Sequence, residues 1–251
     1  MKKAIVLFSG GLDSTTCLAI AQKDGYICHA LSFAYGQRHA IELENAKDIT
    51  NKMCIEHQII KLDTQIFAGN LLTDKNAPLP DFENTVDWAL AKQTSESKRA
   101  CNKTESVIAK NIAPTYVPAR NTIFLAYALA YAENIDADAI YIGISAVDYS
   151  GYPDCRPEFI KAFQNLANLA TKKTTTHSKI KICAPLIALS KAATIKLGIN
   201  LGVNYQSTVS CYQANEKGEA CGRCDSCGLR KEGFKAANIV DPTKYTQDIR
   251  C

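Results

Sequence analysis

The sequence has no apolar run long enough to cross a bilayer, although hydrophobic residues make up 47% of its 251 residues. No signal peptide is expected either, because Met1, Lys2 and Lys3 lead straight into a strand-like run. Charge of one sign is also scarce, since 29 Lys and Arg against 25 Asp and Glu leave a net charge of +4. This mild excess gives no reason to expect direct binding of nucleic acid and suits small anionic ligands. We therefore expect a cytoplasmic globular protein.

Two common phosphate-binding motifs are absent as well. The chain contains no G-x-x-x-x-G-K-[ST] run and no G-x-G-x-x-G run, so neither a Walker A loop nor the dinucleotide fingerprint is present. No internal repeat or coiled-coil heptad is evident. The length suits one large α/β domain with a small appendage.

A different glycine-containing loop joins a strand to a helix near the N-terminus. Residues 4–8 (AIVLF) are typical of a buried parallel strand, and residues 17–22 predict a helix. Gly10 and Gly11 between them let the backbone turn and approach a ligand. The N–H groups of the first helical turn then favour an anion, and the alternative is a plain strand–turn–helix connection. The hydroxyl donors of this stretch are Ser9, Ser14, Thr15 and Thr16.

The rest of the chain alternates strand-like and helix-like patterns, which predicts a doubly wound, mostly parallel α/β sheet flanked by helices. Further strands are expected over residues 27–33, 57–62, 139–144 and 180–184. Asn121 or Thr122 is expected to cap a central apolar helix over residues 123–132. We expect a nucleotide-binding domain over residues 1–205, with an insertion at about 63–113, and a C-terminal region over 206–251.

Polar residues follow the ends of several strands, where ligands of open α/β sheets bind. Tyr35, Arg38 and His39 follow the second strand, and Arg120 precedes the central helix. A phosphate or substrate contact is one interpretation, and a solvated loop is the other. The loop after residues 139–144 adds Asp148, Tyr149, Asp154 and Arg156.

Four of the 11 cysteines form a C-x9-C-x2-C-x2-C pattern near the C-terminus. An odd number of cysteines in a chain of this type disfavours a disulfide framework. Four thiolates can close a tetrahedral site, and zinc prefers this ligand set. An iron–sulfur cluster and unliganded thiols remain the alternatives. The predicted metal ligands are Cys211, Cys221, Cys224 and Cys227.

Taken together, these motifs resemble the 7-cyano-7-deazaguanine synthase family of the queuosine pathway, within the adenylating N-type ATP pyrophosphatases. Two departures are a segment over about 84–113 that is longer than the family needs and a slightly long spacing between Cys211 and Cys221. The resemblance implies an adenine nucleotide alpha hydrolase-like (Rossmann-like) fold. The matching strings are residues 7–17 (LFSGGLDSTTC), 35–39 (YGQRH), 117–121 (VPARN), 148–156 (DYSGYPDCR), 189–192 (LSKA), 210–212 (SCY) and 221–227 (CGRCDSC).

The resemblance also implies a reaction. Members of this family convert 7-carboxy-7-deazaguanine, ammonia and ATP to the nitrile through an adenylated acid and an amide. Free ammonia is the expected nitrogen source, because no glutaminase domain fits in the remaining residues. Mg²⁺ and a structural Zn²⁺ are the expected metal ions, and a homodimer is expected by analogy.

The resemblance assigns roles residue by residue. Ser9, Asp13 and Ser14 are expected to be catalytic, with Asp13 helping to place Mg²⁺ beside the phosphates. The expected ATP-binding residues are Phe8, Ser9, Gly10, Gly11, Leu12, Asp13, Ser14, Thr15, Thr16, Cys17, Leu18 and Arg120. The expected substrate-binding residues are Tyr35, Arg38, Asp148, Tyr149, Asp154 and Arg156.

Two other functions compete with this interpretation. A tRNA-modifying adenylating enzyme, such as a thiolase or a lysidine-type ligase, shares the Ser-Gly-Gly-x-Asp-Ser loop, but it needs a basic face for tRNA. A non-catalytic interaction module held together by zinc would leave the phosphate loop without a purpose. Binding of ATP distinguishes this last class from the two enzymes.

Overall fold

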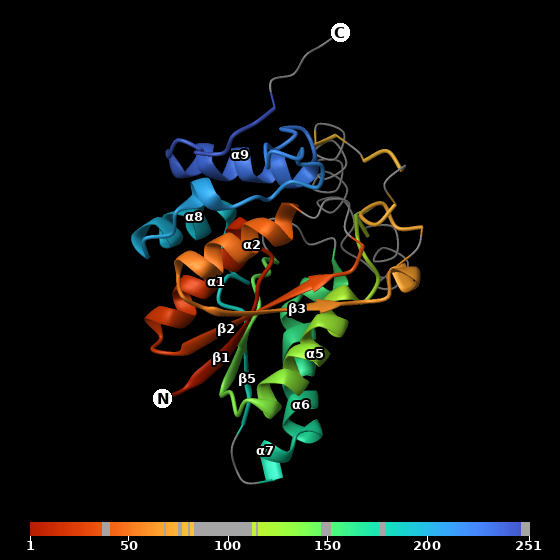
Figure 1. The fold of residues 1–251 in the computed structure, drawn as a ribbon, viewed down its shortest axis with the longest axis vertical. Helices are drawn as coiled ribbons and strands as arrows, with labels where there is room; N and C mark the ends of the chain where they lie inside the picture. The colour runs from red at the N-terminus through yellow and green to blue at the C-terminus, as the bar shows by residue number, and fades with distance from the viewer. Residues whose placement is uncertain are drawn as a thin grey trace, which may run out of the picture.

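The structure of the chain is a computed structural model, and it describes residues 1–36, 41–67, 69–74, 77–79, 81–82, 112–113, 115–146, 152–175 and 179–246. Five parallel strands form one sheet in the order β3-β2-β1-β4-β5 (Figure 1). β1 and β4 are neighbours although they are not consecutive in the chain, so the direction of winding reverses between them. The strands are β1 (Lys3–Leu7), β2 (Ile27–Ala34), β3 (Glu56–Lys61), β4 (Ala139–Tyr141) and β5 (Lys181–Cys183).

Helices cover both faces of the sheet, which confirms the predicted doubly wound α/β fold (Figure 1). In β1, Ala4 and Val6 pack against α1 and α2, whereas Ile5 and Leu7 pack against α5 and α6. This two-sided burial explains why residues 4–8 read as a continuous apolar run. The helices are α1 (Leu12–Lys23), α2 (Ile41–Lys52), α5 (Arg120–Asn134), α6 (Pro157–Ala170), α7 (Lys172–Thr175), α8 (Lys191–Asn200) and α9 (Asp225–Ala237), with short 3-10 turns at Thr64–Phe67, Pro153–Cys155 and Tyr205–Ser207.

The predicted start of the central helix is wrong. α5 begins at Arg120, and its N-cap is Ala119, a left-handed residue with φ 54° and ψ 20° whose side chain makes no cap. Asn121 lies inside the helix, where its backbone N–H donates to Asp154 Oδ2 at 2.9 Å. A carboxylate from 33 positions away therefore caps this helix. Reasoning from neighbouring residues alone could not find that cap.

The C-terminal part of the chain packs on α1 through α8 and α9. Tyr205 OH lies 2.8 Å from Thr16 Oγ1, inside α1, and also donates to Thr194 O. Arg230, whose side chain is 3% exposed, donates to Tyr205 O and to Asp241 Oδ1. These buried polar contacts join residues that are distant in the sequence. The predicted domain division after residue 205 stays a prediction.

The predicted insertion over residues 63–113 falls mostly outside the described residues. One described part of it reaches the C-terminal region, because Phe82 N donates to Arg223 O at 2.8 Å. The Phe82 ring also packs closely against Gly228 of α9. Within the described ranges, no helix is both long and apolar enough to cross a membrane.

Replacing Arg230 should destabilise the fold, because Arg230→Ala leaves the mostly buried Asp241 carboxylate without its cation. We expect the free energy of unfolding to fall by about 3–5 kcal/mol, the range for breaking one side of a buried ion pair. Chemical denaturation measures this change. Lys235→Ala, at an exposed position of the same helix, should change it by less than about 0.5 kcal/mol. Equal losses in both variants would contradict this account.

Candidate active site

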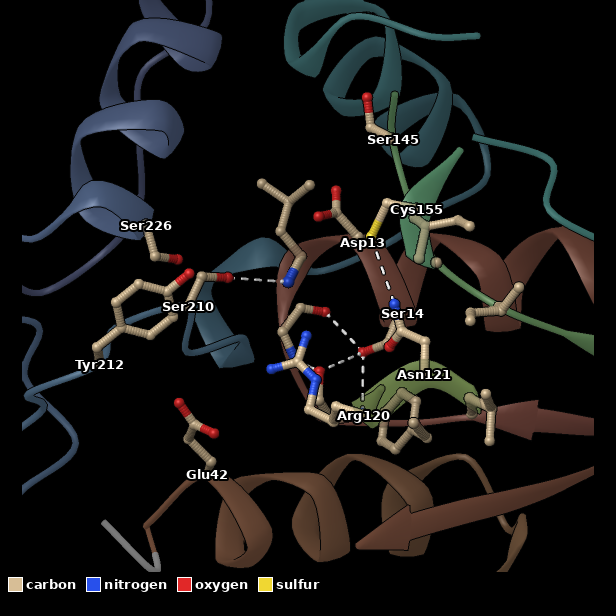
Figure 2. A pocket seen from close by; sticks show the side chains of 18 of the residues that line it. Asp13, Ser14, Glu42, Arg120, Asn121, Ser145, Cys155, Ser210, Tyr212 and Ser226 are labelled. Atoms are coloured by element: carbon tan, nitrogen blue, oxygen red, sulfur yellow. Dashed lines mark hydrogen bonds between the residues drawn. The ribbon is translucent and has the colours of Figure 1, made fainter. Parts of the chain in front are cut away.

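A cavity of about 340 Å³ opens at the carboxyl ends of β1 and β4, where the strand order reverses. Leu7 and Phe8 line it from the end of β1, and Ile142 to Ser145 line it from the segment after β4. The opposite wall comes from the C-terminal segment, with Ser210 and Tyr212 pointing toward the loop and Arg120 (Figure 2). The site thus lies where open α/β sheets bind their ligands.

The loop of residues 9–14 is held in shape by its own side chains. Ser14 Oγ accepts from Ser9 N at 3.2 Å and donates to Gly11 O at 3.1 Å, while Ser9 Oγ accepts from Gly11 N at 3.3 Å. Gly10 has φ +76°, and a Cβ there would lie 3.0 Å from the Ala46 backbone nitrogen. The turn therefore requires glycine, and the loop is organised before any ligand arrives.

Helix α1 begins at this loop without a side-chain cap on Gly11. Its first backbone donor, Leu12 N, donates to Ser210 Oγ of the C-terminal segment at 3.0 Å (Figure 2). Val209 N also donates to Gly10 O at 3.3 Å. The positive end of α1 and the nearby hydroxyl groups of Ser9 and Ser14 lie together in the cavity wall, an arrangement that favours an anion.

An ion pair that the sequence analysis did not identify lies at the centre of the cavity wall. Lys191 Nζ donates to both carboxylate oxygens of Asp13, at 2.9 and 2.8 Å. Lys191 occupies the first position of α8, after Ser190, which caps the helix by accepting from Ala193 N. A cation there opposes the helix dipole, and this conflict was the available signal that Lys191 has another role.

Arg120, Tyr35 and Glu42 form a second polar group in the same cavity. Burial raises the pKa of the Glu42 carboxyl to about 7, while the attraction of Arg120 opposes part of the rise. Burial also raises the pKa of Tyr35, against a hydrogen bond to Arg120. Glu42 points into the cavity from the first turn of α2 (Figure 2). The sequence carried no signal for it, because an acidic residue in a first helical turn is ordinary.

The predicted ATP-binding residues divide into two groups. Phe8, Ser9, Gly11, Leu12, Asp13, Ser14 and Arg120 line the cavity. Thr15 and Thr16 instead donate to carbonyl groups one helical turn back, at Gly11 and Leu12. Direct ATP contacts stay predictions for both groups, and also for Gly10, Cys17 and Leu18.

The predicted substrate-binding residues also divide. Tyr35 lines the cavity. The Asp154 side chain is 6% exposed and caps α5 through Asn121 N, and Arg156 is the N-cap residue of α6. Neither of these two is among the described residues that line the cavity. Arg38, Asp148 and Tyr149 lie outside the described residues, so a substrate role for all of them stays a prediction.

The four predicted cysteines lie together, with their sulfur atoms all within 4.8 Å of one another. Cys221 and Cys227 are 4.0 Å apart, close to the ~3.8 Å edge of a tetrahedron with 2.3 Å metal–sulfur bonds. Backbone N–H groups of Gln213 and Cys221 donate to Cys211 Sγ, each at 3.2 Å, which stabilises a thiolate. The four side chains thus fit a single tetrahedral metal ion.

The sheet, the loop of residues 9–14 and the cysteine cluster define an α/β protein with a nucleotide-binding fold and a C-terminal region whose four cysteines could hold a metal ion. A family model described as "Queuosine biosynthesis protein QueC" matches residues 3–238, so the chain belongs to the QueC family of queuosine biosynthesis enzymes. These family matches do not favour the tRNA-modifying alternative.

Full-length relatives agree with this family. The chain is 55% identical over 250 residues to the 7-cyano-7-deazaguanine synthase of Legionella pneumophila strain Corby, covering 99% of each protein. It is 54% identical to the synthase of Coxiella burnetii strain RSA 331, covering 99% of this chain and 100% of that one. Among solved structures, the NMN synthetase of Francisella tularensis is similar with a TM-score of 0.45 and 18% identity, covering 95% of this chain and 78% of that one.

Breaking the central ion pair should weaken nucleotide binding. Lys191→Met leaves the Asp13 carboxylate uncompensated beside the anion-binding loop, where it repels phosphate groups. We expect ATP to bind about 10–100-fold more weakly in magnesium-free buffer, a loss of about 1.4–2.7 kcal/mol that titration calorimetry measures.

Adding Asp13→Asn to Lys191→Met should recover much of that affinity, because the repelling charge is then gone. Lys196→Met, at an exposed position of α8, serves as the matched control and should leave binding unchanged. Full ATP affinity in Lys191→Met alone would contradict the role given to the pair.

Proposed function

We propose that this enzyme converts 7-carboxy-7-deazaguanine, ammonia and ATP to 7-cyano-7-deazaguanine. The observation that carries the proposal is the match along 99% of the chain to relatives with this activity in their names. The cavity supports it, because an organised anion-binding loop faces a space of about 340 Å³.

The chemistry explains why such a loop is needed. A carboxylate is a poor electrophile because it is already anionic, and adenylation neutralises it and supplies a leaving group. The first turn of α1, with Ser9 and Ser14, would hold the departing pyrophosphate and stabilise its charge. Ammonia then displaces AMP to give an amide. A second adenylation, at the amide oxygen, permits elimination to the nitrile, and we propose that one cavity serves both steps.

Asp13 would supply a carboxylate for Mg²⁺, because this ion is usually bound through one or two carboxylates and substrate phosphates. Lys191 orients that carboxylate by contacting both of its oxygens. Arg120, at the start of α5, would bind the nucleotide phosphate, and Tyr35 would contact the deazaguanine substrate. Free ammonia as the nitrogen donor, a homodimer and a cytoplasmic location are further parts of this proposal.

Zinc is the metal that we propose for the cysteine cluster. All four ligands are sulfur, which leaves no open position for substrate and fits a structural site. An iron–sulfur cluster would place several iron atoms among the four cysteine sulfurs. The cysteine sulfurs would then lie farther apart than the 4.8 Å within which they are found. Cys211 also lines the cavity, as do its neighbours in the chain, Ser210 and Tyr212. Zinc would therefore fix one wall of the active site.

The direct test of the reaction uses the purified protein with ATP, Mg²⁺, ammonium and 7-carboxy-7-deazaguanine, followed by mass spectrometry of the base. We expect the nitrile to form, and we expect Asp13→Ala and Ser9→Ala to abolish turnover without unfolding the protein. Recovery of unchanged acid from the wild-type enzyme would refute the proposal. Activity on tRNA instead would revive the tRNA-modifying alternative.

Removing one metal ligand should loosen the C-terminal region. Cys224→Ser is expected to lower the zinc content well below one ion per chain and to reduce the thermal midpoint, because metal binding contributes to folding free energy. Elemental analysis and thermal unfolding measure these two changes. Cys54→Ser, at an exposed cysteine outside the cluster, should change neither. Finding iron in place of zinc would contradict the zinc assignment and favour an iron–sulfur cluster.

A further inference from the structure

The proposed reaction requires a proton acceptor in the cavity, and the anion-binding loop does not supply one. Ammonia carries three hydrogens and a nitrile nitrogen carries none, so each turnover must remove three protons from nitrogen. One leaves when ammonia displaces AMP from the acyl carbon and the amide forms. The other two leave when the carbon–oxygen bond to the second AMP breaks and the carbon–nitrogen triple bond forms. A group that accepts protons must therefore face the reacting nitrogen.

The described residues that line the cavity include three carboxyl groups and no histidine. Asp13 has both of its oxygens bound by Lys191. Asp225 directly follows the metal ligand Cys224 and starts α9, so it belongs to the metal-binding region. Glu42 is the remaining carboxyl group, and no lysine pairs with it among the described ion pairs.

The geometry places Glu42 opposite the loop that carries the leaving group. It enters the cavity from the first turn of α2, while Asp13 and Ser14 enter from α1 (Figure 2). The Arg120 side chain lies between Glu42 and the loop in this view (Figure 2). A substrate bound between the loop and Glu42 would thus have its leaving group on one side and a carboxylate on the other.

We propose that Glu42 is the general base that takes the protons from nitrogen during amide and nitrile formation. This inference rests on the proposed function and adds a residue to it. The positive charge of Arg120 favours the carboxylate form until the proton transfers, and water then carries the proton away between steps.

The electrostatic surroundings of Glu42 suit this role. Its burial raises the pKa to about 7, so near neutral pH the carboxyl group accepts and releases protons readily. Among the described residues, the charged and titratable groups that interact with it are Arg120 from α5 and Tyr35 after β2. Only Arg120 lowers the pKa, and its effect is smaller than that of burial.

The test separates steps that break an N–H bond from steps that do not. Acid-dependent exchange of pyrophosphate into ATP reports adenylation, which breaks none, whereas conversion of the amide to the nitrile breaks two. For Glu42→Gln we expect exchange within about threefold of the wild type. We expect nitrile formation to fall about 10²–10⁴-fold, the usual contribution of a general base.

The pH profile provides a readout that a structural role would not change. The wild-type rate of nitrile formation should rise as the pH passes about 7, because the deprotonated carboxylate is the active form. Glu42→Gln should lose this rise, and Glu42→Asp should keep it at a lower rate. Glu44→Gln, at an exposed residue of the same helix that pairs with Lys47, is the matched control. It should retain both the rate and the profile.

Three results would overturn this inference. Wild-type nitrile formation by Glu42→Gln would show that Glu42 is not the base. An increase in KM for the deazaguanine with kcat and the pH profile unchanged would show that it binds the substrate instead. An equal loss in exchange and in nitrile formation would make it structural. In all three the wild-type enzyme still makes the nitrile, so failure of the proposed function is a separate and recognisable outcome.

Discussion

The N-cap residue of helix α1 is Gly11, which has no side chain to cap the helix, and much of the site depends on that fact. An uncapped first turn leaves backbone N–H groups that need a partner, and at a sheet reversal that partner is a ligand anion or another segment of the chain. Ser210 Oγ accepts a hydrogen bond from the Leu12 N–H group, and the rest of the first turn of α1 faces the cavity. The α1 terminus therefore contacts the C-terminal segment on one side and faces the cavity with its N-terminal turn on the other.

The C-terminal region is accordingly a wall of the active site as well as a cover for α1. Val209 N bonds to Gly10 O, and Tyr205 OH contacts Thr16 within α1. Cys211 follows directly, so a metal ion on the four cysteines would restrain the segment that touches the loop. Loss of the metal should then disturb the nucleotide loop, although no metal ligand needs to touch the substrate.

Charges in the cavity are arranged in two pairs of opposite sign. Lys191 neutralises Asp13 beside the loop, and Arg120 faces Glu42 across the cavity. In the proposed reaction, each pair would combine a cation for phosphate groups with a carboxylate for a metal ion or a proton. Burial works against an ionised Glu42, whereas Asp13 is in direct contact with the cation Lys191. Two carboxylates in one cavity can thus have different roles because their partners and burial differ.

The sequence by itself determined the sheet, the loop and the cluster of four cysteines, because each is a local pattern. The apolar run of residues 4–8, the glycines at 10 and 11 and the cysteine spacing are set by backbone geometry over short stretches. Only the tertiary structure decided that Lys191 pairs with Asp13, which is 178 positions away. It also decided that Asp154 caps α5, and it placed Glu42 where burial raises its pKa. These features depend on contacts between distant segments, and such contacts leave no periodic pattern in the chain.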